Sequence, residues 1–267
     1  MSQADRAYHD EGQIDGGLEL ATRIYLANVG VNASHRFSSP IFKDGTFEFI
    51  PIPEDPDLSG PDVVRYSDLR SYNSPNRDLT EHIPERLWDH PCHNDPEFVT
   101  FTYGDTCETT PRAASLRGME SGDVLFFLAR LERWLGGGRS GGYGFYLVGF
   151  LEIDEVLRDV KFRPELPVLR RFGANAHIRA GLWDRFWVFK GSSRSRRFRV
   201  AVPVDREIAQ RVFTSADGSP WRWGAGRTDL QVIGSYTRSC RCVMDPTLPG
   251  QSERADALWA WVARHTQ

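Results

Sequence analysis

Cysteine, lysine and long apolar runs are all scarce in this chain of 267 residues. The four cysteines are too few for a disulfide scaffold, and none has the Cys-x-x-Cys spacing of a zinc ribbon. No run of 18 or more apolar residues occurs, so we expect no membrane span. The polar N-terminus lacks the basic start and apolar core of a signal peptide. These absences predict a cytoplasmic protein with no membrane partner.

Positive charge comes almost entirely from arginine. Lysine occurs only at positions 43, 161 and 190, whereas arginines crowd into residues 179–199 and 222–241. The planar guanidinium suits phosphates and base edges better than an ammonium does, which favours a basic patch that contacts nucleic acid. A GC-rich coding bias, which favours arginine codons, is the alternative explanation, and the sequence does not choose between them.

Frequent strands with few long helices predict an α+β protein built on a curled, mixed or antiparallel sheet. Residues 23–30 read as an apolar strand closed by glycine, and residues 123–153 read as a hairpin. The glycine-rich segment 136–142 predicts a mobile hairpin tip, because glycine contributes no side-chain packing. We expect a short helix or turn at 154–160 and a basic loop at 191–199.

Two further expectations concern the ends of the chain. Helices are predicted at 205–212 and 256–263. Residues 1–20 combine many charges with three glycines, so we predict a flexible N-terminal tail. Residues 21–267 are then expected to form a single α+β domain.

The most informative polar stretch lies at residues 89–97 and contains His93, Asp95 and Glu97. Alternate side chains of an extended segment project to one side, so these three are expected to converge. A carboxylate beside an imidazole fixes its tautomer and raises its basicity, which suits acid–base catalysis near neutral pH. The alternative is that Asp95 caps a turn before Pro96 and that His93 lies at the surface.

Cys92 is a third catalytic candidate, because an adjacent imidazole can lower the pKa of a thiol. A buried, inert cysteine is the alternative. His90, Cys92, His93 and Cys107 would supply zinc-type ligands, but the His-x-Glu and Pro-Cys-x-x-Cys signature of zinc deaminases is absent. We therefore predict no metal ligands, and the sequence does not identify a cofactor.

Candidates for substrate binding lie in the second half of the chain. His177 and Asn175 could contact a base or phosphate, and Trp223 could stack on a base. The arginine-rich loop is a candidate phosphate-binding loop, in which Arg194, Arg196 and Arg197 would contact the phosphates. The alternatives are an ordinary packed histidine, a solvated loop and core tryptophans. No P-loop, Rossmann fingerprint or Gly-x-Ser-x-Gly elbow occurs, so nucleotide-driven and serine-hydrolase chemistry have no support.

Several short segments together resemble the third nucleotide-modification-associated domain family, over roughly residues 23 to 205. The segments that carry the resemblance are Ser39-Pro-Ile41, Asp44-Gly45, Pro51-Ile-Pro53, His93-Asn-Asp-Pro-Glu97, Gly122-Asp-Val-Leu-Phe-Phe127 and Asn175-Ala-His-Ile178. The chain departs from the family at residues 32–37, where the family has Phe-Asp with glycines. The strand at 122–127 and the one that follows it also look like a PUA-like barrel (named for pseudouridine synthase and archaeosine transglycosylase).

The resemblance implies an association with systems that modify or process nucleobases, mainly in DNA. Our first hypothesis is a nucleobase-modifying enzyme in which His93 and Asp95 transfer protons and arginines hold phosphate. The expected partner is a nucleic acid or nucleotide, with DNA preferred over RNA. The alternatives are a non-catalytic PUA-like reader of a modified base, and a nucleotide-binding component of phage defence.

Overall fold

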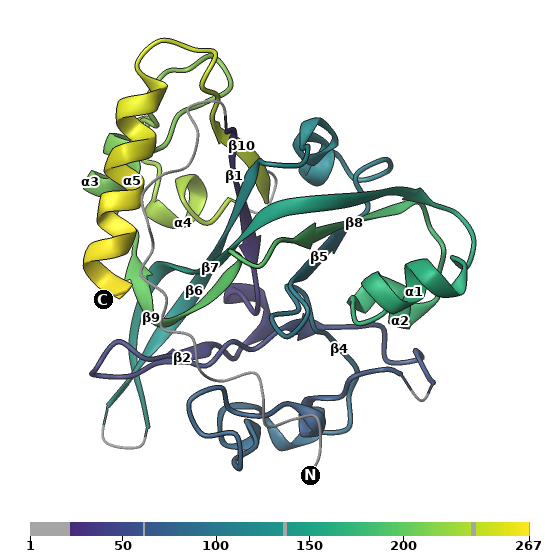
Figure 1. The fold of residues 1–267 in the computed structure, drawn as a ribbon. Helices are drawn as coiled ribbons and strands as arrows, with labels where there is room; N and C mark the ends of the chain where they lie inside the picture. The colour runs from purple at the N-terminus through teal and green to yellow at the C-terminus, as the bar shows by residue number, and fades with distance from the viewer. Residues whose placement is uncertain (1–21, 61, 136–137, 236–238, 267) are drawn as a thin grey trace.

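The computed structural model describes residues 22–60, 62–135, 138–235 and 239–266 (Figure 1). Its centre is an eight-stranded mixed sheet in the order β10-β1-β6-β7-β8-β5, with β2 beside β6 and β9 beside β7. Strands β3 and β4 pair separately. The strands are β1 (Ile24–Val29), β2 (Ser39–Ile41), β3 (Ile52–Pro53), β4 (Cys92–His93), β5 (Thr102–Asp105), β6 (Val124–Leu135), β7 (Gly138–Val160), β8 (Phe186–Gly191), β9 (Arg196–Pro203) and β10 (Cys240–Met244).

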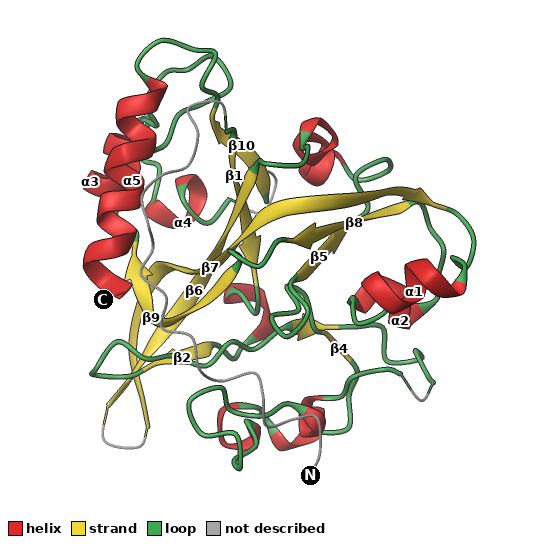
Figure 2. Cartoon of the chain, viewed as in Figure 1, coloured by secondary structure: helices red, strands yellow, loops and turns green. Residues whose placement is uncertain are grey.

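The α-helices flank the sheet, and α5 covers part of one face, where Trp259 contacts Phe126 (Figure 2). Helices α3 and α5 pack together on one side, and α1 and α2 lie between the ends of β7 and β8. The helices are α1 (Leu166–Phe172), α2 (Ala176–Ala180), α3 (Arg206–Val212), α4 (Asp229–Val232) and α5 (Gln251–Thr266), and a 3-10 helix spans Pro111–Gly118. None of the described helices is long and apolar enough to cross a membrane. The predicted α+β class is confirmed, and the described strands do not close into a barrel.

Strand β6 is the central strand, and its sequence shows why. Residues 124–129 are all buried, because β6 pairs in parallel with β1 on one edge and antiparallel with β7 on the other. Successive side chains face opposite layers: Phe126 contacts Trp259 of α5, and Phe127 contacts Tyr103 of β5. A strand covered on both faces carries a continuous apolar run instead of an alternating one.

The extents of strands β7 and β9 correct three local predictions. Residues 154–160 are not a helix but the end of β7, where Val156 pairs with Phe189 and Leu157 with Val188 of β8. Residues 138–142 are strand, since β7 already begins at Gly138, while 136–137 lie outside the described residues. The basic loop is shorter than predicted because β9 starts at Arg196. The predicted N-terminal tail lies outside the described residues.

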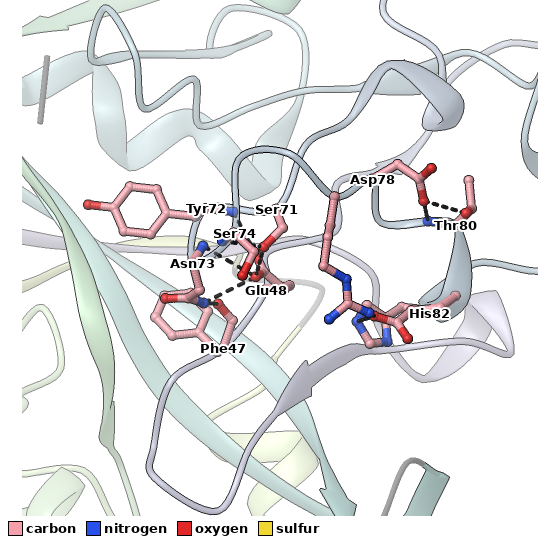
Figure 3. Close-up of polar contacts among 11 residues, drawn as sticks. Phe47, Glu48, Ser71, Tyr72, Asn73, Ser74, Asp78, Thr80 and His82 are labelled. Carbon is pink, nitrogen blue, oxygen red and sulfur yellow. Dashed lines mark hydrogen bonds and ion pairs between the residues drawn. The ribbon is translucent and has the colours of Figure 1, made fainter. Parts of the chain in front are cut away.

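The irregular segment between β3 and β4 is held against the sheet by the buried carboxylate of Glu48 (Figure 3). Glu48 accepts hydrogen bonds from the Ser71 hydroxyl (2.6 Å), the Tyr72 backbone N–H (3.0 Å) and the Asn73 side-chain amide (3.1 Å). Arg197 lies 3.7 Å from the same carboxylate. A buried carboxylate with this many donors is stabilising, and here it fixes the segment that leads to His93.

Candidate functional site

A cavity of about 540 Å³ lies where the end of β1, strands β4 and β5, and helix α2 meet. This volume falls within the range of about 300–1,000 Å³ that is common for small-molecule sites. Its wall includes the polar side chains of His93 and Asp95, which are close together in the sequence, and of His177, which lies far along the chain. The cavity is therefore the candidate functional site.

His93 is placed by the pairing of β3 with β4, in which it lies opposite Ile52. This pairing also brings in Glu54, whose carboxylate Oε2 lies 2.6 Å from Nδ1 of His93. The hydrogen bond fixes the ring orientation and leaves Nε2 3.8 Å from Oδ2 of Asp95. Burial lowers the pKa of His93, but the bond to Glu54 and the charges of Asp95 and Glu54 outweigh burial and raise it overall. The same hydrogen bond lowers the pKa of Glu54.

Asp95 is buried, with 5% of its surface exposed. Its Oδ2 accepts hydrogen bonds from the Gly104 backbone N–H (2.6 Å) and from the Asn175 side-chain amide (3.4 Å). Its Oδ1 has no hydrogen-bond partner among the described residues. Burial raises the pKa of Asp95 to about 8, against the opposing effects of His93 and the two hydrogen bonds. The carboxylate is thus only half satisfied by the protein around it.

His177 lies in the first turn of α2, where the Asn175 side chain caps the helix by accepting from the His177 backbone N–H (3.1 Å). Its ring stacks on Phe186, with centroids 5.1 Å apart, and meets the His93 ring edge-on at 4.7 Å. Burial and then the charge of His93 lower the pKa of His177 to about 3, although a hydrogen bond to the Gly104 backbone opposes this. The ring is therefore neutral near pH 7.

The close approach of these groups depends on Gly104 in β5. A Cβ atom there would lie 2.5 Å from Cδ2 of His177 and 2.9 Å from Oδ1 of Asn175. Both distances are shorter than ordinary contact, so any larger residue would push α2 or its side chains away from Asp95. The glycine therefore lets the β5 backbone approach His177 and Asn175 while its N–H donates to Asp95.

Two arginines also line the cavity. The guanidinium of Arg130, at the point where β6 stops being fully apolar, lies 3.7 Å from the centroid of the Tyr143 ring. Arg112 belongs to the 3-10 helix that follows β5. Within the described part of the chain neither forms an ion pair with a carboxylate, so both can bind an anionic ligand.

The structure brings some of the predicted site residues together. His93, Asp95 and His177 share the cavity wall, and Asn175 lies directly behind them, bonded to Asp95. Cys92 does not line this cavity: it is buried in a separate apolar cluster, and burial raises the pKa of its thiol. Glu97 turns away, because its carboxylate accepts from the backbone N–H groups of the turn at 98–100.

The predicted arginines and tryptophan lie elsewhere. Arg194 pairs with Glu152 (3.1 Å), and Arg196 stands on β9 opposite Phe150. Arg197 belongs to the Glu48 network described above. The Trp223 indole donates to Asp229 Oδ1 (2.8 Å). None of these four side chains lines the cavity.

Sequence reasoning missed Glu54, Gly104, Arg112 and Arg130. Glu54 stands at the start of a proline-spotted, polar stretch and looks like a solvated loop residue. The one available signal is that it follows the Pro51–Pro53 segment, which carries part of the family resemblance. Arg130 could have been noticed as the first charge after the apolar run of β6.

Comparison with known proteins identifies a family. No curated protein and no solved structure matches the chain. Residues 23–223, well over half of the chain, match the family described as nucleotide modification associated domain 3. The match covers His93, Asp95 and His177, together with Glu54 and Gly104. The chain therefore belongs to the nucleotide modification associated domain 3 family.

Proposed function

We propose that this protein is an enzyme that modifies or processes a nucleobase, and that its reaction takes place in the cavity beside His93, Asp95 and His177. The observation that carries the proposal is the convergence of these three side chains in the wall of one cavity of ligand size. Membership of a family associated with nucleotide modification supports the class of substrate. Structural histidines and carboxylates rarely gather in this way without a ligand to act on.

The proposed chemistry is proton transfer at this centre. Glu54 holds the His93 ring so that Nε2 faces Asp95, and a substrate group or a water between them can lose or gain a proton there. Asn175 acts as a positioning residue, since it bonds both Asp95 and the first turn of α2. Cys92 has no part in this scheme because its thiol is buried away from the cavity.

The proposed substrate is a base carried by a nucleotide, with DNA as the favoured polymer. A base would enter the cavity, while Arg112 and Arg130 would contact phosphate or a base edge. A base in duplex DNA must leave the helix to reach such a site. Arg194, half exposed on the turn before β9, can then contact the backbone of a longer strand.

Mass spectrometry of nucleosides tests this proposal. DNA from cells that produce the full chain is compared with DNA from cells that produce His93→Ala and from cells that lack the protein. An altered nucleoside that appears only with the unmodified protein is the expected result. DNA that is identical in all three cultures would contradict the enzyme.

The two other functions predict different results in the same cultures. A PUA-like reader leaves the nucleosides unchanged, yet the purified protein binds modified duplex DNA more tightly than plain duplex in a fluorescence assay. A nucleotide-binding defence component is toxic on expression without changing the bases. The two histidines and the buried Asp95 carboxylate that meet in the cavity wall favour the enzyme over both.

A further inference from the structure

We propose that His93, Asp95 and His177 bind one divalent transition-metal ion. Each offers one donor atom, and the three donor atoms lie within 4.8 Å of one another. Donors about 2.1 Å from a tetrahedral ion lie about 3.4 Å apart, and Nε2 of His93 is already 3.8 Å from Oδ2 of Asp95. Small side-chain rotations are enough to bring all three donors onto one ion.

The surroundings of the two histidines hold their rings in place, as metal ligation requires. Nδ1 of His93 is held by the Glu54 carboxylate at 2.6 Å, so Nε2 faces the centre. Histidine ligands typically donate their second ring N–H to a carboxylate or a backbone carbonyl in this way. The His177 ring is held by stacking on Phe186, with centroids 5.1 Å apart.

Asp95 provides an independent observation. Its side chain is buried, and among the described residues Oδ1 has no hydrogen-bond partner. A buried polar oxygen without a partner is costly, and proteins seldom keep one without a reason. A cation held by both oxygens of the carboxylate would satisfy Oδ1 without any further protein donor.

The ligand set indicates the class of ion. Two imidazoles with one carboxylate are typical of catalytic zinc sites and of non-haem iron(II) sites, in which the remaining coordination positions are open. Here those positions would face the cavity that also contains Arg112 and Arg130. If the proposed function holds, the ion would bind a water there and lower its pKa, so the bound water would supply the proton-transfer group in place of the His93 and Asp95 atoms that hold the ion.

This proposal departs from the sequence-based expectation of no metal ligands. The zinc-type set considered from the sequence combined His90, Cys92, His93 and Cys107, of which only His93 belongs to the cavity wall. Asp95 was interpreted as an acid–base group instead of a ligand, and the position of His177 could not be foreseen because α2 reaches the wall only through the fold. His90 therefore serves as a matched control, since it is partly buried and its Nδ1 lies against the Pro91 carbonyl.

The experiment uses the full chain after treatment with a chelator and dialysis. Zn²⁺, Mn²⁺ and, without oxygen, Fe²⁺ are titrated separately by calorimetry, and bound metal is counted by mass spectrometry. We expect about one ion per chain for the unmodified protein and for His90→Ala. His177→Ala and Asp95→Asn should lose the ion, and Glu54→Gln should bind it about 10–100-fold more weakly. Circular dichroism and thermal melts check that each variant is folded.

Absence of stoichiometric binding of all three ions to the folded, unmodified protein would overturn the proposal. So would a His90→Ala protein that loses as much metal as His177→Ala does. If the variants fail to fold, Co²⁺ added to the unmodified protein gives a second readout: visible bands of a four- or five-coordinate ion with nitrogen ligands are expected, and the spectrum of hexaaqua Co²⁺ alone contradicts the site. Metal binding without an altered nucleoside would sustain this inference while removing the proposed function.

Discussion

Glu48 and Asp95 are both buried carboxylates in the same protein, and their surroundings differ sharply. Glu48 is 4% exposed and Asp95 is 5% exposed, so burial does not distinguish them. Glu48 accepts from a hydroxyl, a backbone N–H and a side-chain amide, and Arg197 lies beside it. Asp95 leaves one oxygen without a partner and faces two histidines. Glu48 is therefore surrounded by hydrogen-bond donors, whereas Asp95 is surrounded by groups that could take part with it in a reaction.

The difference separates a structural carboxylate from a functional one. The donors around Glu48 come from the irregular segment that it holds in place, so the interaction stabilises the fold. The groups around Asp95 leave an oxygen uncompensated, which costs stability. Proteins tend to break local rules of polar satisfaction at functional sites and keep them elsewhere. Substitutions at the two positions should therefore affect different properties.

The largest effect is expected for Asp95→Asn on the proposed reaction. Loss of the carboxylate removes a group of the reacting centre, and the rate should fall by about 10²–10⁴-fold. The free energy of unfolding should change by less than about 1 kcal/mol, because a neutral side chain of the same shape replaces a poorly compensated one. Rates of nucleoside modification and chemical denaturation measure the two quantities. A rate unchanged within twofold would contradict the assignment.

Glu48→Ala should have the opposite profile. Removing the acceptor takes away the carboxylate that Arg197 and the Ser71–Asn73 donors share, which should lower the free energy of unfolding by about 3–5 kcal/mol. Activity per folded molecule at low temperature should remain close to that of the unmodified protein, because Glu48 does not line the cavity. Urea denaturation measures the loss. A stability equal to that of Asp95→Asn would remove the distinction between the two carboxylates.

Gly104→Ala sharpens the comparison by disturbing the Asp95 side alone. The added methyl group would collide with His177 and Asn175, so we expect ligand or metal binding at the cavity to weaken about tenfold or more. Gly138→Ala is the matched control, since Gly138 is also in a strand and a Cβ there meets nothing within 4 Å. Calorimetric titration compares the two variants. Equal affinities would show that the backbone at residue 104 does not set the geometry.

The smallest effect concerns His82, which lies in the segment anchored by Glu48 (Figure 3). Burial lowers its pKa below the ordinary value of 6.5. Between this lowered pKa and pH 6.5, the imidazole of the unfolded chain binds a proton that the folded protein does not. The contribution of His82 to stability is therefore complete above pH 6.5 and is lost as the pH falls toward the folded pKa. His82→Phe should make the decline in the free energy of unfolding shallower by up to about 1.4 kcal/mol per pH unit below pH 6.5. An equally steep decline in the free energy of unfolding of the unmodified protein and of His82→Phe would contradict the lowered pKa of His82.

Patterns of neighbouring residues predicted the strands and helices whose structure depends on those residues alone. The apolar runs of β1 and β6 and the helix α3 were evident, because these patterns are carried by adjacent residues. The end of β7 was assigned wrongly, since only its pairing with β8 makes residues 154–160 a strand. Propensity alone cannot reveal a partner that lies far along the chain.

The same limit applies to the candidate site. His93 and Asp95 were identified as a pair because they are close in sequence, and His177 was named as a binding residue. The contact of His177 with the other two depends on the position of α2. The contact between Glu54 and His93 depends on the pairing of β3 with β4. The arginine loop was chosen by charge alone, whereas the cavity carries two arginines that are isolated in the sequence.

The most direct test of the account compares nucleosides from cells that produce the unmodified protein, Asp95→Asn or Glu48→Gln, all grown at low temperature and matched for the amount of folded protein. The account predicts an altered nucleoside with the unmodified protein and with Glu48→Gln, and none with Asp95→Asn. An altered nucleoside that persists in Asp95→Asn, or that disappears only in Glu48→Gln, would contradict it.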